Sequence, residues 1–180
     1  MNYRAAELLA RHHDLDEFVC GSVEQTEWLR RYARQSMTSG ATKVFVVTPA
    51  DSHAVIAYYA WTMAQIDVAD APKRLIKGAG RYPQPVALLA RLGVHQNHER
   101  KGLGAGLLQD VLRRVAAISN EIGCRGLLVH AESDRARCFY RHLIPEFEQS
   151  PTDELHLVLL LKDIKRTLQC TAGEPRGRAR

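Results

Sequence analysis

Hydrophobic positions follow a helical period in two stretches of the chain. From Val23 onward, Trp28, Leu29 and Tyr32 recur three to four positions apart with arginines between them. This spacing predicts a helix that ends at Ser39-Gly40. A second stripe predicts a long helix that opens at Gly102–Gly106 and ends at Gly123. Its apolar positions are Leu103, Leu107, Leu108, Val111, Leu112, Val115 and Ile118.

Shorter runs rich in β-branched and aromatic residues predict strands. We expect them at Lys43–Thr48, His53–Ala64, Val86–Val94, Arg125–His130 and Leu155–Leu161. A turn at 49–52 joins the first two into a hairpin, and residues 67–85 are expected to be irregular because prolines and glycines interrupt any period. A short helix is expected at Asp134–Leu143 and a last helical turn at Lys162–Leu168. This order predicts an α/β fold with a mixed, mostly antiparallel central sheet and helices on both of its faces.

Length and composition fit one globular domain. The chain has 180 residues, of which 46% are hydrophobic, and a single domain is expected over residues 1–168. Residues 169–180 are expected to form a disordered basic tail, because the end of the chain has almost no apolar content. The longest apolar stretch, near Leu155–Leu161, is far too short to span a membrane. The start of the chain lacks the apolar core of a signal peptide, so we expect a cytoplasmic protein.

Net charge, cysteines and histidines do not by themselves select one class of function. The net charge of +5 is compatible with an anionic partner, either nucleic acid or a phosphorylated cofactor, and equally with a solvated cationic face. The cysteines Cys20, Cys124, Cys138 and Cys170 are widely separated, so free thiols are expected. The histidines show no metal-ligand spacing, and no metal is expected.

A glycine-rich turn is the main candidate binding site. A strand expected to end at Val94 is followed by a short loop and by Gly102, Gly104 and Gly106 at a helix start. Free N–H groups and the helix dipole at such a start favour an anion, and glycine lets the backbone approach it closely. Arg100 and Lys101 add positive charge. A glycine-rich helix start without a ligand is the alternative.

Three phosphate-bearing ligands compete for this turn. A Walker A loop requires Gly-Lys-Ser/Thr, whereas Lys101 precedes Gly102 here. A dinucleotide fold prefers G-x-G-x-x-G near the start of an alternating chain, whereas this turn reads G-L-G-A-G and follows a hairpin. The remaining ligand is the pyrophosphate of coenzyme A.

The stretch from Leu88 to Val111 resembles the central motif of GNAT acetyltransferases, a strand followed by Gln/Arg-x-x-Gly-x-Gly/Ala and a helix. Gly102 and Gly104 match this motif, whereas Glu99 stands at its first position. The resemblance implies the GNAT fold and acetyl-CoA as cosubstrate, bound by the turn's backbone amides and by the preceding strand. The residues that it implicates in acetyl-CoA binding are Leu92, Val94, Glu99, Arg100, Lys101, Gly102, Leu103, Gly104, Ala105 and Phe139.

A second element of the same family lies at Ala136–Tyr140 and resembles its A-x-x-F-Y helix. The resemblance implies that Tyr140 is the catalytic acid, which donates a proton to the leaving thiolate. A phenol with a pKa of about 10 stays protonated at neutral pH and is suited to this role. On the residues alone, a helix tyrosine packed on the sheet is the favoured interpretation of Tyr140.

The first half of the chain narrows the family further. Phe18–Gly21, Trp28-Leu29, Arg81–Val86 and Leu155–Leu157 resemble the corresponding segments of GNAT toxins from type II toxin–antitoxin pairs. This resemblance implies an acyltransferase that acetylates the α-amino group of aminoacyl-tRNA and blocks translation. It also implies an antitoxin of the ribbon–helix–helix type, with DNA contacted only through that antitoxin. The oligomeric state stays open, and a homodimer is compatible with it.

Basic residues supply candidate contacts to tRNA phosphates. Those near the expected site are Lys73, Arg74, Lys77, Arg81 and Arg91, and a second cluster is Arg30, Arg31 and Arg34. Two other functions stay open at this point: a GNAT N-acetyltransferase of a small amine or a protein amine, and a basic nucleic-acid-binding regulator without enzymatic activity. Acetyl-CoA binding separates the regulator from both enzymes.

Overall fold

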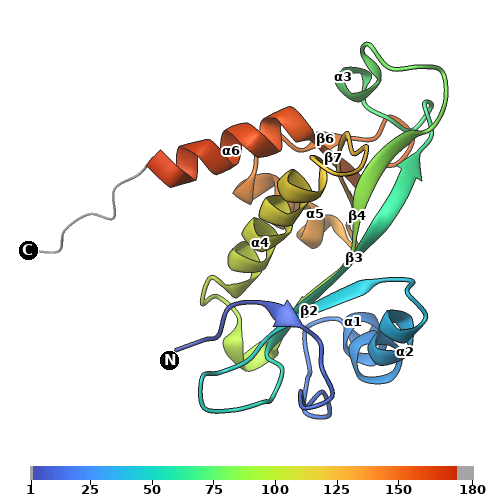
Figure 1. Ribbon diagram of the computed structural model, residues 1–180. Helices are drawn as coiled ribbons and strands as arrows, with labels where there is room; N and C mark the ends of the chain where they lie inside the picture. Colours follow the sequence, from blue (N-terminus) through green and yellow to red (C-terminus); the bar gives the residue numbers. More distant parts are fainter. Residues whose placement is uncertain (1, 174–180) are drawn as a thin grey trace, which may run out of the picture. The chain divides into compact units, whose positions relative to one another are not determined.

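A computed structural model describes residues 2–173, which are organised as two compact units (Figure 1). The first unit is built from the residues up to Thr62 together with Leu88–Val111. The second is built from Met63–Ala87 together with the residues from Leu112 onward. The glycine turn lies in the first unit and Tyr140 in the second, and each unit is described by itself below.

Helical segments and strands are interspersed along the chain. The helical segments are α1 (Val23–Glu27), the π-helical η1 (Trp28–Tyr32), α2 (Ala33–Thr38), α3 (Lys73–Ile76), the 3₁₀ turn η2 (Gln96–His98), α4 (Leu103–Ile118), α5 (Asp134–Leu143) and α6 (Leu161–Gly173). The strands are β1 (Glu7–Leu8), β2 (Lys43–Val47), β3 (Ala57–Ile66), β4 (Gln84–Val94), β5 (Gly126–His130), β6 (Glu148–Gln149) and β7 (His156–Leu160). They are hydrogen-bonded in the order β1-β2-β3-β4-β5-β7-β6, which confirms the α/β prediction.

The first unit has its core between the early helices and the β2–β3 hairpin. Strands β2 and β3 pair antiparallel, with Lys43 opposite Trp61 and Val47 opposite Ala57, and α2 packs against β2 (Figure 1). Leu29 and Tyr58 are fully buried there. The Tyr58 hydroxyl donates to the carbonyl of Gln25 at 2.8 Å, which satisfies its polar end inside this core.

The second unit is built around antiparallel β5 and β7. Gly126 lies opposite Leu160 and His130 opposite His156, and β6 pairs with the other edge of β7. Helix α6 packs on β5 and β7 (Figure 1). Its apolar face is fixed there by Ile164, which is fully buried.

Most sequence-predicted elements are confirmed. Helix α5 has the predicted bounds, Asp134–Leu143. The helical segment after Val23 ends at Thr38, and Gly40 follows with a φ of +77°, a conformation that glycine adopts without strain. Helix α4 ends at Ile118, before the predicted Gly123, because residues 119–122 form turns.

Several boundaries differ because segments distant in sequence pair with them. Strand β3 begins at Ala57, not at His53, since Val55 donates its N–H to the carbonyl of Asp14. Strands β1 and β6, two residues each, were not predicted, and α3 lies inside the segment expected to be irregular.

The last helix is longer than the predicted turn at Lys162–Leu168. Helix α6 continues to Gly173, so the expected disorder is wrong for residues 169–173. Arg166 pairs with Asp163 at 2.9 Å in its first turns, and Asp163 is itself fully buried. The remainder of the predicted tail, residues 174–180, lies outside the described residues.

Candidate active site

The glycine turn has the backbone geometry of an anion-binding loop. Gly102 has a φ of +80°, and a Cβ at this position would meet nothing within 4 Å. Arg100 also has a positive φ, 59°, which is uncommon for a residue with a side chain. Helix α4 begins at Leu103, directly after Gly102. The first N–H groups of a helix have no hydrogen-bond partner within that helix. The turn therefore combines open space, free N–H donors and a helix dipole that favours an anion.

The loop before the turn is fixed by hydrogen bonds to other parts of the first unit. His95 donates its backbone N–H to the carbonyl of Ile56 at 2.7 Å, and Gln96 donates to Val19 at 2.9 Å. The Lys101 ammonium donates to the carbonyl of Asn97 at 2.9 Å. These contacts attach the loop to Ile56 and Val19 and tie Lys101 to Asn97 within the loop.

Strand β4 presents its two implicated residues on one face and Arg91 on the other. Side chains alternate along a strand, so Leu92 and Val94 share a face that Arg91 and Gly93 do not. Gly93 lies against Tyr58, since a Cβ there would come 2.8 Å from the Tyr58 ring. Leu92 and Val94 are partly exposed and lie on the last residues of β4, which precedes the turn in the sequence. Glu99 is also partly exposed.

Tyr140 lies on α5 with its ring buried and its hydroxyl unpaired. The helix begins after Ser133, whose side chain accepts from the N–H of Ala136, and Tyr140 is 7% exposed. Its ring meets Phe139 and Phe147 edge to face, with centroids 5.2 Å and 6.0 Å apart. Among the described residues, nothing forms a hydrogen bond with its hydroxyl.

The surroundings of Tyr140 keep its hydroxyl protonated. Burial raises the pKa of Tyr140 well above its ordinary value, and the nearby Glu132 carboxylate raises it further. Both effects disfavour the phenolate. At neutral pH the side chain is therefore a proton donor without an acceptor in the described protein, which is the state that a catalytic acid needs before its substrate binds.

The basic residues of the second unit differ in how freely their charges face solvent. Arg74 on α3 pairs with Glu148 and, at 3.0 Å, with Asp163, and Glu148 raises the pKa of its guanidinium. Lys73, Lys77 and Arg81 are exposed, and within residues 2–173 none of the three has an ion-pair partner. Arg74 thus stabilises the fold, whereas the other three remain available to an anion.

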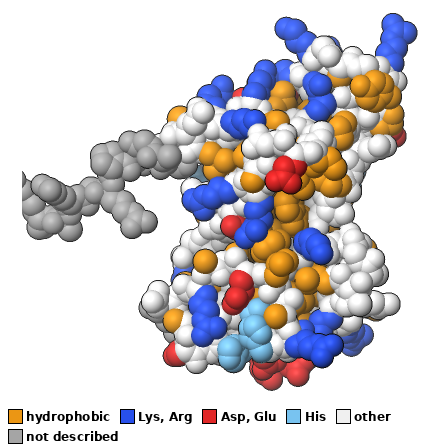
Figure 2. Space-filling model, viewed as in Figure 1, with side chains coloured by type: hydrophobic (Ala, Val, Ile, Leu, Met, Phe, Trp, Pro, Cys, Tyr) orange, Lys and Arg blue, Asp and Glu red, His pale blue; other side chains and the backbone are white. Residues whose placement is uncertain are grey.

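Basic residues of the first unit are mostly engaged. Arg91 pairs with Glu24 and its guanidinium lies 5.6 Å from the centre of the Trp28 ring. Arg34 donates to the backbone carbonyls of Ala10 and His13 at 3.0 and 2.6 Å. Arg31 pairs with Glu27 at 3.7 Å. Figure 2 shows basic side chains distributed over the visible face.

Two basic residues that the sequence did not single out lie beside Lys77. Arg125, directly before β5, and Lys162, at the start of α6, line a cavity of the second unit together with Lys77. No periodicity or motif signals this grouping, because the three residues belong to different elements that only the fold brings together.

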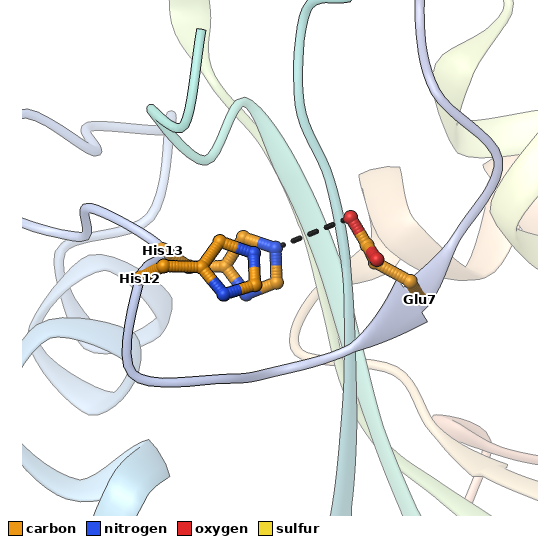
Figure 3. Close-up of side chains that lie close together, drawn as sticks. All are labelled: Glu7, His12 and His13. Atoms are coloured by element: carbon orange, nitrogen blue, oxygen red, sulfur yellow. Dashed lines mark hydrogen bonds and ion pairs between the residues drawn. The ribbon is translucent and has the colours of Figure 1, made fainter.

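Glu7, His12 and His13 form a cluster that histidine spacing did not reveal (Figure 3). The ring of His12 lies over that of His13, with centroids 4.1 Å apart. The N–H of Ala10 donates to Nδ1 of His13 at 2.9 Å, so the ring proton lies on Nε2, which donates to Glu7 at 3.3 Å. Both ring nitrogens of the buried His13 are therefore engaged, and binding a metal there would require breaking one of these bonds.

No helix within residues 2–173 is long and apolar enough to cross a membrane.

Comparison with known proteins finds a curated relative that matches nearly the whole chain. The tRNA-acetylating toxin of Mycobacterium tuberculosis (strain ATCC 25618 / H37Rv) is 38% identical over 163 residues, which cover 91% of this chain and 95% of that protein. No protein-family model matches the chain.

Several solved structures have the same fold. A mutant of KacT matches with a TM-score of 0.86 at 22% identity, over 93% of this chain and 99% of the other. AtaT complexed with acetyl-methionyl-tRNAfMet matches with a TM-score of 0.83 at 22% identity, over 93% and 99%. A mutant of the toxin AtaT bound to acetyl-CoA and to the C-terminus of the antitoxin AtaR matches with a TM-score of 0.78 at 20% identity, over 94% and 99%.

At these identities the structures show the fold. The identity and coverage of the curated relative show the family: this chain belongs to the tRNA-acetylating toxins.

Proposed function

We propose that this protein transfers the acetyl group of acetyl-CoA to the α-amino group of an aminoacyl-tRNA and thereby blocks translation. The observation that carries the proposal is the 38% identity to a tRNA-acetylating toxin over 91% of the chain. The open, positively charged glycine turn and the unpaired hydroxyl of Tyr140 fit this chemistry.

Acetyl-CoA supplies the acetyl group as a thioester, and the first unit provides the features that suit its phosphates. The N–H groups from Arg100 to Ala105 and the dipole of α4 bind the pyrophosphate, with the charges of Arg100 and Lys101 beside it. The open space at Gly102 admits a phosphate close to the backbone. Leu92 and Val94 on β4, together with Leu103, Gly104 and Phe139, complete the proposed acetyl-CoA contacts. Glu99 replaces the family's Gln or Arg, so Arg100 supplies the charge at that end.

Tyr140 acts as the general acid in this proposal. As the amine nitrogen bonds to the acetyl carbon, the bond from that carbon to sulfur breaks, and the Tyr140 hydroxyl gives its proton to the departing thiolate. The raised pKa of Tyr140 keeps that proton in place until the thiolate forms. The conjugate phenolate then recovers a proton from solvent or from the amine that has reacted.

The acceptor amine requires no strong base. An α-amino group has a pKa of about 8, and the ester bond of an aminoacyl-tRNA lowers that pKa further. A sizeable fraction of the amine is then neutral and nucleophilic at pH 7. This suits the proposed site, in which Tyr140 donates a proton and the nearby Glu132 carboxylate is not required as a base.

The tRNA phosphates require cations, and the exposed Lys73, Lys77 and Arg81 are the proposed contacts. The predicted contacts at Arg74 and Arg91 are weaker proposals, because both guanidinium groups already pair with carboxylates. The proposed partner is an antitoxin of the ribbon–helix–helix type, through which any contact with DNA is made. A cytoplasmic location follows from the proposed substrate, since charged tRNA is used there.

The proposal is tested by incubating the protein with charged total tRNA and labelled acetyl-CoA. We expect label on the α-amino group of tRNA-bound amino acids, identified after the ester is hydrolysed. Uncharged tRNA and free amino acids are the controls and should stay unlabelled. Label on polyamines or peptide amines alone would replace the proposal with a small-amine or protein acetyltransferase, and an absence of acetyl-CoA binding would favour a nucleic-acid-binding regulator.

A further inference from the structure

The second unit contains a cavity whose charged lining is entirely basic. It has a volume of about 420 Å³, and its charged lining residues are Arg74, Lys77, Arg125 and Lys162. Leu75 and Leu160 contribute apolar wall. No carboxylate lines it, so the cavity favours an anionic group over a neutral or cationic one.

Three of the four cations keep their charge available. Arg74 is neutralised by Glu148 and by the buried Asp163. Lys77 and Lys162 are exposed, and neither ammonium has a carboxylate partner within the described part of the chain. The net charge of the lining therefore comes from Lys77, Lys162 and Arg125.

Arg125 is held rigidly but is not saturated. Its Nη2 donates to the carbonyl of Leu75 at 2.6 Å, which fixes the guanidinium beside α3. Its Nε is buried and has no partner in residues 2–173, and no hydrogen bond is made by Nη1 within them. A guanidinium presents its donors in a rigid fork that matches phosphate oxygens, so a fixed and unsaturated one is well suited to bind a phosphate.

Helix α6 adds a further feature that favours negative charge. It begins at Leu161, whose N–H donates to the carbonyl of Arg125, and Leu161 and Lys162 both line the cavity. The start of the helix and the Arg125 backbone are thus joined at the cavity wall. The helix dipole is positive at this end and supplements the three cations.

We propose that the cavity formed by Lys77, Arg125 and Lys162 binds a backbone phosphate of the tRNA. This inference rests on the proposed function for the identity of the RNA. It extends that function, because it assigns RNA contacts to β5 and α6, where the sequence indicated none. RNA is favoured over a small anion because two further cations lie close to Lys77 in the sequence. Lys73 lies on α3 and Arg81 follows that helix, and both are exposed and have no ion-pair partner within the described residues. Successive phosphates of one strand can therefore be met by neighbouring cations.

The test compares Lys77→Ala/Lys162→Ala with the matched double variant Lys43→Ala/Lys165→Ala. Both remove two exposed lysine charges, but Lys43 and Lys165 lie outside the cavity lining. Arg125 is left unchanged because it also braces α3. The dissociation constant of uncharged tRNA is measured across a salt series, and the acetyl-CoA-induced rise in melting temperature is measured for each variant to check that the fold is intact.

In the cavity variant, the negative slope of log affinity against log salt should become shallower by about one unit. The control variant should keep the wild-type slope. Equal slopes in wild type and cavity variant would overturn the inference. A second result would also overturn it: inorganic phosphate raises the melting temperature of the wild type but not of the cavity variant, while the two proteins show the same salt slope for tRNA. The cavity would then hold a small anion. Uncharged tRNA carries no amine to acetylate, so its binding is measured independently of the proposed reaction. The protein could acetylate charged tRNA even if the cavity does not bind RNA, and the cavity could bind RNA even if no acetylation occurs.

Discussion

At the scale of single residues, Tyr140 combines a packed ring with an unpaired hydroxyl. Its ring contacts Phe139 and Phe147, whereas its hydroxyl has no partner in the described protein. Packing and chemistry therefore depend on different atoms, and a substitution can remove one without the other.

Tyr140→Phe should lower the turnover number on charged tRNA by about 10²-fold or more, which is the contribution of one general acid. The melting temperature and the dissociation constant of acetyl-CoA should barely change, because the ring remains and no hydrogen bond is lost. Tyr32→Phe, at a tyrosine that is 52% exposed on η1, is the control and should retain full turnover. Wild-type turnover in Tyr140→Phe would limit this tyrosine to a packing role.

At the scale of elements, the start of α4 is the proposed binding site for the pyrophosphate of acetyl-CoA. Gly104→Phe places a large side chain in the first turn of α4, beside the proposed pyrophosphate contacts. The variant should lose the rise in melting temperature that acetyl-CoA produces by mass action, while the melting temperature without ligand stays close to that of the wild type.

Gly106→Ala is the matched control in the same helix. A Cβ at Gly106 would meet nothing within 4 Å, and alanine stabilises a helix interior by about 0.5–1 kcal/mol relative to glycine. The control should bind acetyl-CoA normally and melt at a slightly higher temperature. If Gly104→Phe still shows the full ligand-induced shift, the pyrophosphate binds elsewhere.

At the scale of the whole molecule, histidines with depressed pKa values make stability depend on pH. Burial is the largest cause that lowers the pKa values of His13, His98 and His130 from the ordinary 6.5. A histidine with a depressed pKa binds fewer protons in the folded state than in the unfolded state. Its contribution is therefore fully present above pH 6.5 and is lost as the pH falls below that value toward the folded-state pKa.

The melting temperature should fall between pH 7.5 and pH 5.5. His13→Asn should reduce this fall, because asparagine cannot titrate and its side-chain oxygen can still accept from the N–H of Ala10. The variant loses the contact with Glu7, so its melting temperature at pH 7.5 should also be lower. Parallel pH profiles for wild type and variant would show that His13 does not contribute to the pH dependence.

The local pattern of the sequence was sufficient for the elements that carry the proposed chemistry. The apolar stripe from Leu103 to Ile118 predicts α4, and the glycines before and within its first turn predict the anion-binding geometry seen at Gly102. The bounds of α5, and with them the helical position of Tyr140, also follow from the pattern. These features depend on residues within a few turns of one another, so periodicity and glycine placement determine them.

Only the tertiary structure decided which charged and titratable groups are free. Arg74 and Arg91 appeared equivalent to Lys73 and Arg81 in the sequence, yet both pair with carboxylates from other elements. The same holds for the cluster of Glu7, His12 and His13, and for the cavity that Lys77 shares with Arg125 and Lys162. The physical reason is that ion pairing and desolvation depend on contacts between residues far apart in the chain, and no local period encodes these contacts.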